Sequence, residues 1–245
     1  MPFLDHLEEL RWRILWSIVA LVVGSIIGFL LLQRYDLFEL LKAPIAPYLP
    51  EGRLFVTRPT DAFIITLKLA VAVGAVLASP VIFAQVWKFL APALYEHEKR
   101  YIVPTLIAGL GLFLAGVLMA YLWVLPAVFA ILDKVGDRLG VEAIYTASDY
   151  IGFALQMVLA FGIMFQLPIV MVLLSVMGLV QPKTFARQRP IALVLASIVA
   201  ALLTPPDVFS MMMMMVPLLL LYEAGILVSR LAIKRGAARR IGKDS

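Results

Sequence analysis

Six long apolar runs constrain the fold of this chain more than any other feature. A helix needs about 20 apolar residues to cross a hydrocarbon core of about 30 Å, and most of these runs reach that length. They lie at about 12–32, 61–90, 102–131, 149–177, 190–203 and 211–228. Hydrophobic residues make up 63 % of the 245 residues and charged residues only 15 %, more apolar surface than a soluble domain can bury. We predict an all-α, polytopic membrane protein with six transmembrane helices in one integral membrane domain, residues 1–245.

The N-terminal segment, MPFLDHLEELRWR, places apolar residues at helical spacing and charged residues between them. This pattern predicts a short amphipathic helix lying on the membrane before the first span. The first run is too long for a signal-peptide core and has no convincing cleavage site, so we expect a retained anchor. Gly24 and Gly28 form a GxxxG pair within it. Such a pair permits a second helix to approach closely, although chance matches are common in apolar segments.

The distribution of lysine and arginine predicts the orientation of the spans. Counted together, the N-terminal segment, the connections after the second and fourth runs and the tail 229–245 hold 14 lysines and arginines, whereas the two intervening connections hold 6. Because short cytoplasmic segments carry the excess of Lys and Arg, we expect both termini to lie in the cytoplasm.

Several kinds of chemistry are excluded or disfavoured by the sequence. The chain has no cysteine, so it forms no disulfide or thiolate metal site. His97-Glu98 begins an HExxH pattern, but Tyr101 stands at the second histidine position, and no GxxxxGK[ST] loop occurs. We therefore expect no enzyme activity and no cofactor. The net charge of +5 does not indicate nucleic-acid binding, because the basic residues lie between and after apolar runs.

The stretch from Gln85 to Arg100, QVWKFLAPALYEHEKR, joins two apolar runs and must emerge at a membrane face. It places Glu98 near Phe89 and other aromatic residues. A carboxylate beside rigid aromatic rings suits a peptide that carries arginine, because guanidinium and carboxylate groups pair in two-pronged fashion. The alternative is an ordinary charged interfacial loop with aromatic residues at the membrane boundary.

Polar groups within the later runs also require an explanation, because they are costly in a bilayer. Gln166 precedes Pro168, and it serves either as a docking point for a partner helix or as a structural hydrogen-bonding group. Asp207 follows Pro205 and Pro206 at a turn, where it suits a helix cap. Glu223 is expected to pair with a nearby Lys or Arg. The run 190–203 rises only about 21 Å, so it thins the bilayer locally or is shielded by neighbours.

Four segments of the sequence resemble one known family. HLEELRWR, SPVIFAQVWKFLAPALYEHEKR, GLVQPKTFARQRP and LLTPPDVFS occur in that order, and they are similar to TatC, the core subunit of the twin-arginine protein translocase. The resemblance covers essentially the whole chain. It implies six spans with short fifth and sixth helices, in the cytoplasmic (inner) membrane of a prokaryote. It also implies binding of twin-arginine signal peptides, export of folded cargo driven by the proton-motive force, TatA- and TatB-type single-span partners, and self-association within the complex.

The resemblance assigns roles to particular residues. Glu9, Arg11, Gln85, Phe89 and Glu98 match signal-peptide-binding positions, with Glu98 as the loop carboxylate that holds an arginine. Asp207 matches an acidic residue of the last outer loop, beside Pro205 and Pro206, a structural or translocation position. Many family members carry Glu where this chain has Gln166, which is expected to dock a partner helix.

Two other classes of function compete with this interpretation. Proline-broken helices and a buried amide also suit a small-molecule or ion secondary transporter, although no internal repeat supports one. An intramembrane hydrolase is disfavoured because the sequence offers no nucleophile–base pair.

Overall fold

The computed structural model describes residues 2–49, 54–90, 102–140, 145–204 and 208–241, with side chains described for most of them. These residues are helical throughout apart from short connections and one isolated parallel bridge between Phe55 and Thr146, which confirms the all-α prediction. Five helical segments are long and apolar enough to cross a membrane. They are Leu7–Arg34, Asp61–Phe89, Val103–Leu139, Ala147–Val176 and Ser210–Lys234.

The chain divides into two compact units, which we describe separately: Met1–Leu159 and Ala160–Ser245. The first contains α1 (Pro2–Arg34), α2 (Leu37–Lys42), the 3-10 helix η1 (Ala43–Tyr48), α3 (Asp61–Leu90), α4 (Ile102–Met119), the π-helix η5 (Ala120–Val124), α5 (Leu125–Leu139) and most of α6 (Ala147–Met164). The second contains the end of α6, α7 (Leu167–Val176), α8 (Pro182–Arg187), α9 (Arg189–Leu203) and α10 (Val208–Ile241).

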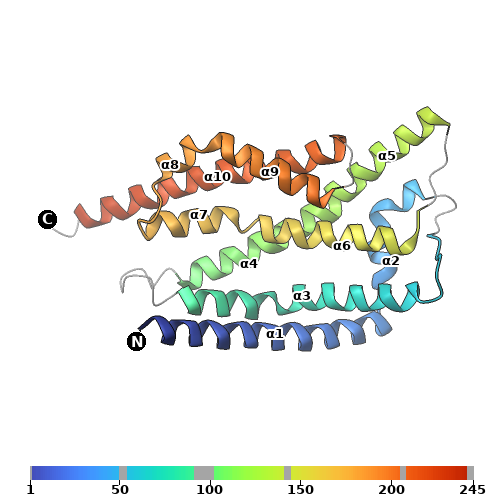
Figure 1. The fold of residues 1–245 in the computed structure, drawn as a ribbon, viewed down its shortest axis with the longest axis horizontal. Helices are drawn as coiled ribbons and strands as arrows, with labels where there is room; N and C mark the ends of the chain where they lie inside the picture. Colours follow the sequence, from blue (N-terminus) through green and yellow to red (C-terminus); the bar gives the residue numbers. More distant parts are fainter. Residues whose placement is uncertain (1, 50–53, 91–101, 141–144, 205–207, 242–245) are drawn as a thin grey trace. The chain divides into compact units, whose positions relative to one another are not determined.

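The first unit is built on α1 and α3, which run side by side (Figure 1). Three glycines allow their backbones to touch. A Cβ atom at Gly24 would lie 2.5 Å from the carbonyl oxygen of Gly74, and one at Gly28 would lie 2.7 Å from that of Ala70. The GxxxG pair, which permits a close approach, thus lies at a backbone contact with α3.

The separate amphipathic helix that we predicted at the N-terminus is not present. A single helix, α1, continues through Pro2–Arg34. Neither glycine nor proline occurs between Phe3 and Val23, so nothing breaks the helix where the surface segment would pass into the span. At about 1.5 Å per residue, its 33 residues reach about 50 Å, more than the hydrocarbon core requires.

The connection between the first two spans contains two short helices, α2 and η1. Two tyrosines fix this segment from other helices of the same unit. Tyr121 and Tyr150 donate hydrogen bonds to the consecutive carbonyl oxygens of Leu40 and Leu41. The buried Ile45 of η1 completes the contact with α5, so the segment forms an ordered cap.

The third span continues beyond the predicted residue 131. It passes from α4 through η5 into α5 and ends at Gly140, whose positive φ of 65° closes the helix in a left-handed cap. The π-turn lies directly before Pro126. Proline lacks an N–H and its ring collides with the carbonyl one turn earlier, and a wider turn at this point lets the helix continue.

The second unit pairs α10 with α7 and α9. Pro168 separates α6 from α7, so the predicted fourth span, 149–177, consists of two helices with Phe165 and Gln166 between them. The α9 helix has 15 residues and rises about 22 Å, as expected for the short fifth run. In contrast to the predicted end at residue 228, α10 continues to Ile241, because its basic continuation contains no proline.

Candidate functional site

A cluster of three polar side chains joins α1 to α3. Arg13 donates through Nη2 to Glu9 Oε1 at 2.8 Å and through Nη1 to Gln85 Oε1 at 3.2 Å. Glu9 and Arg13 lie one turn apart on the same face of α1, whereas Gln85 comes from α3. The side chains of Arg13 and Glu9 are 28 % and 33 % exposed. Their attraction is therefore less screened than that of a fully exposed pair.

The guanidinium of Arg13 still has capacity to donate. Its Nε atom is buried and makes no hydrogen bond to any residue within the described ranges. Arginine presents five N–H donors in a fixed plane and has no acceptor. Arg13 therefore has an N–H group left to donate in addition to its bonds to Glu9 and Gln85.

An apolar groove of about 290 Å³ begins at this cluster and follows the line between α1 and α3. Arg13 and Gln85 are among the residues that line it, and the others are mostly aliphatic. They are Leu10, Ile14, Ser17, Ile18, Leu21, Ile82, Val86 and Phe89. A long apolar wall with polar groups at one end suits a ligand that is itself apolar with a charged end.

Three of the predicted signal-binding residues come together here. Glu9 and Gln85 bind the same arginine, and Phe89 lines the groove. Arg11 is exposed, and it lies about 200° around the helix from Arg13, so it faces away from the cluster. Glu98 lies outside the described residues.

Sequence reasoning did not select Arg13 as a site residue. Its spacing of four from Glu9 could have indicated an ion pair on one helix face. Arg13 and Gln85 are 72 residues apart in the sequence, so their hydrogen bond can be recognised only when the pairing of α1 with α3 is known.

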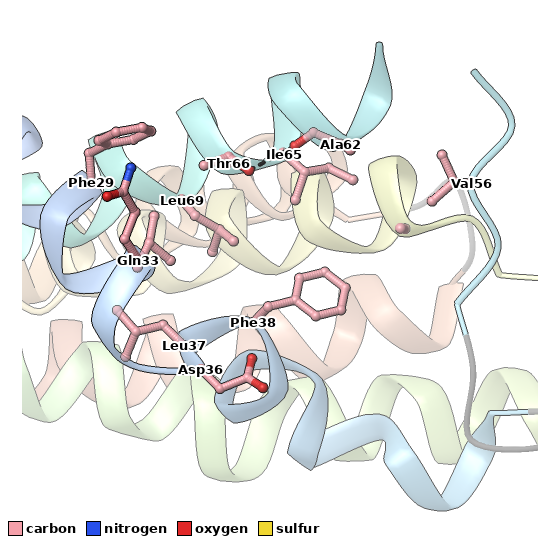
Figure 2. Close-up of a pocket in the computed structure, with 12 residues that line it drawn as sticks. Phe29, Gln33, Asp36, Leu37, Phe38, Val56, Ala62, Ile65, Thr66 and Leu69 are labelled. Atoms are coloured by element: carbon pink, nitrogen blue, oxygen red, sulfur yellow. Dashed lines mark hydrogen bonds between the residues drawn. The ribbon is translucent and has the colours of Figure 1, made fainter. Parts of the chain in front are cut away.

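A second pocket, of about 350 Å³, lies where α1 ends, α2 follows and α3 begins (Figure 2). Because the groove is lined by the first half of α1 and the pocket by its last turns, the two lie towards opposite ends of the helix pair. Its polar groups serve the local backbone: Asp36 accepts from the N–H of Glu39, and Thr66 donates to the carbonyl of Ala62. The pocket is thus a mostly apolar recess in which Asp36 and Thr66 already bond the local backbone.

Gln166 lies at the break between α6 and α7, and its side chain is partly exposed. Its own N–H donates to the carbonyl of Ile163, and its carbonyl accepts from Val170. The side chain does not cap α7. Pro205, Pro206 and Asp207 lie outside the described residues.

The predicted pairing of Glu223 is confirmed. Arg189, the first residue of α9, donates to both carboxylate oxygens of Glu223 on α10, at 2.6 and 2.7 Å. Tyr222, next to Glu223 on α10, donates to the carbonyl of Phe185 at 2.8 Å. This hydrogen bond joins α8 to α10 beside the ion pair. Within the ranges that the structure describes, no group of three or more metal-ligating side chains occurs.

Comparison with known proteins identifies the family. Residues 5–217 match the family described as "Sec-independent protein translocase protein (TatC)". The chain is 41 % identical over 236 residues to the Sec-independent protein translocase protein TatC of Aquifex aeolicus, covering 96 % of this chain and 97 % of that protein. It is 38 % identical over 239 residues to the TatC protein of Escherichia coli K12, covering 97 % and 92 %.

A solved structure agrees with the sequence matches. The crystal structure titled "Twin Arginine Translocase Receptor- TatC" superposes with a TM-score of 0.84 at 41 % identity, covering 93 % of this chain and 99 % of that one. The chain therefore belongs to the TatC family of Sec-independent protein translocase proteins. Its relatives are named as components of protein-transport machinery and not as enzymes.

Proposed function

We propose that this chain is the signal-peptide receptor and core of a twin-arginine translocase, which exports folded proteins using the proton-motive force. The observation that carries the proposal is the polar cluster of Glu9, Arg13 and Gln85 at the end of an apolar groove. A signal peptide that places paired arginines before an apolar stretch has the matching order of chemistry. A solved structure that is similar to this chain is titled a twin-arginine translocase receptor.

Glu9 and Glu98 jointly hold the arginine pair in this proposal, with Arg11, Gln85 and Phe89 around them. Carboxylates pair with guanidinium groups through two parallel hydrogen bonds, which a lysine ammonium cannot reproduce. The apolar part of the signal then follows the wall formed by Ile18, Ile82 and their neighbours.

The proposed setting is the cytoplasmic (inner) membrane of a prokaryote, with six spans and both termini in the cytoplasm. Five helical segments have the length and composition of spans, and α9 supplies the sixth as a short helix. The total of 14 lysines and arginines in the segments assigned to the inside, the two terminal segments included, against 6 in the segments assigned to the outside, supports this orientation. The lipid bilayer is the solvent, and further copies of the chain join it within the complex.

Gln166 is the proposed docking point for a TatA- or TatB-type single-span partner. Its partly exposed side chain lies at a helix break, where the backbone already departs from regular α-helix. An amide both donates and accepts hydrogen bonds, and such bonds in a bilayer contribute about 0.6 to 2 kcal/mol each. That magnitude suits transient recruitment.

The test is binding of a synthetic signal peptide with Arg-Arg, and of its Lys-Lys counterpart, to the purified full-length chain. We expect the Arg-Arg peptide to bind more tightly, and the Glu9→Gln and Glu98→Gln variants each to weaken that binding. Glu39→Gln is the matched control, because Glu39 also pairs with a cation on its own helix but lies outside the proposed site. Undiminished crosslinking of the Arg-Arg peptide in Glu9→Ala/Glu98→Ala would contradict the site assignment.

A further inference from the structure

We propose that Arg13 is an internal competitor of the signal peptide's arginine for Glu9 and thereby lowers the affinity of the site for its guest. Arg13 binds the carboxylate of Glu9, which an incoming guanidinium needs in the proposed function. This inference rests on the proposed function, because it names a competitor for the same group.

The geometry of the cluster carries the inference. Arg13 holds Glu9 at 2.8 Å through a single nitrogen, and its other terminal nitrogen is bound to Gln85. Glu9 is not among the residues that line the groove, whereas Arg13 is. Arg13 therefore both lines the groove and holds the carboxylate of Glu9.

The contact is weak enough to be exchanged. It engages Oε1 of Glu9 from one donor, and both side chains keep about a third of their surface exposed. A two-pronged guanidinium–carboxylate pair is stronger than this one-pronged contact. An incoming arginine can gain that geometry, and the released Arg13 keeps its bond to Gln85 on α3.

Competition of this kind lowers the affinity for every guest that needs Glu9. A lysine ammonium is a compact, strongly hydrated point charge without the planar fork, so it pairs with Glu9 less well than a guanidinium does. The cost of releasing Arg13 from Glu9 is the same for either guest, so the internal competitor weakens binding of both signals by the same factor.

The test measures the dissociation constants of Arg-Arg and Lys-Lys signal peptides for the full-length chain in detergent. We expect Arg13→Gln to bind the Arg-Arg peptide about 2 to 5 times more tightly, the range that a partly exposed ion pair contributes. The Lys-Lys peptide should gain by the same factor, because the release of Arg13 costs the same for either guest, so that the ratio of the two constants stays unchanged. Arg34→Gln is the control: Arg34 is an exposed arginine on the same helix, near its other end, and should leave both constants unchanged.

Unchanged or weaker binding of the Arg-Arg peptide by folded Arg13→Gln would overturn the proposal, since it would make Arg13 a residue that only positions Glu9. Thermal unfolding in detergent checks that the variant is folded. If it is not, Arg13→Lys retains the charge and should tighten binding by a smaller factor, and the absence of any tightening in that variant also overturns the proposal. If the wild-type chain binds neither peptide, the proposed function itself fails.

Discussion

At the scale of single residues, Gly24 and Gly74 allow α1 and α3 to pack closely because neither has a side chain. Each lies where the backbone of the other helix occupies the space of a Cβ atom, at 2.5 and 2.4 Å. Those neighbours are backbone atoms of Gly74 and Ser25, which cannot rotate away as a flexible side chain can. Substitution must therefore separate α1 from α3.

We expect Gly24→Ala to destabilise the chain by about 1–3 kcal/mol, the usual cost of overpacking. Thermal unfolding in detergent measures it. Gly111→Ala is the matched control, because a Cβ atom at Gly111 of α4 meets nothing within 4 Å. Alanine in a helix interior is favoured over glycine by about 0.5–1 kcal/mol, so the control should be neutral or stabilising. Equal unfolding temperatures in the two variants would contradict the backbone contact.

Gln166 provides a second test at this scale. Gln166→Leu should reduce crosslinking to a TatA- or TatB-type partner while signal-peptide binding survives, because the leucine fills similar space without hydrogen bonds. Gln166→Glu should retain docking, with a pH dependence introduced by a carboxyl in apolar surroundings. Normal recruitment by Gln166→Leu together with a lower unfolding temperature would make the residue a structural group only.

Residue-level reasoning from sequence reached part of the site. Glu9 and Gln85 were identified through their position in the resembling motifs, and the structure brings them to one arginine. Arg13 itself was missed, because the pairing of α1 with α3 cannot be derived from either helix alone. The partner of Glu223 was predicted as a basic residue, but its identity as Arg189 depends on how α9 folds back against α10.

At the scale of elements, α9 is the unusual member. Its 15 residues rise about 22 Å, less than a hydrocarbon core of about 30 Å. The two-pronged bond between Arg189 and Glu223 fixes the first residue of α9 to α10. The α9 helix therefore cannot slide along α10 to make up for its short length at the other end.

We expect insertion of four leucines, about one turn, into the second half of α9 to impair export without abolishing signal-peptide binding. The physical reason is that a longer helix removes the local thinning of the bilayer that a short one imposes. Export of a folded reporter and binding of the Arg-Arg peptide are measured on the same variant. Export at the original level would contradict the thinning proposal, and equal loss of both activities would indicate misfolding.

Hydrophobic runs predicted the bounds of α3 and α9 well. The run at 61–90 coincides with α3 (Asp61–Leu90), and 190–203 differs from α9 by one residue. The helices α1 and α10 continue beyond the apolar runs at 12–32 and 211–228, because hydropathy measures what a bilayer accepts and not where a backbone stops being helical. Charged residues continue both helices beyond their apolar runs.

At the scale of the whole molecule, the absence of cysteine offers a clean test of topology. Single cysteines introduced at Tyr35 and at Gln188, both exposed, should react with a membrane-impermeant thiol reagent from opposite sides. In the proposed orientation Tyr35→Cys is labelled from outside the cell, and Gln188→Cys only after the membrane is opened. Labelling of both from the same side would refute the six-span arrangement, and the reverse pattern would refute the orientation.

The glycine contact between α1 and α3 has a mechanical consequence for the first unit. Gly24, Gly28 and Gly74 lie between the groove near Arg13 and the recess near Gln33. Because the two helices meet backbone to backbone at these glycines, we expect that spreading them at the groove tilts one helix against the other about this contact and draws them together at the recess. Spin labels across each end, read with and without a bound peptide, should then report distance changes of opposite sign. A guest that enters the groove would thus alter the recess several turns away, at the opposite end of the helix pair.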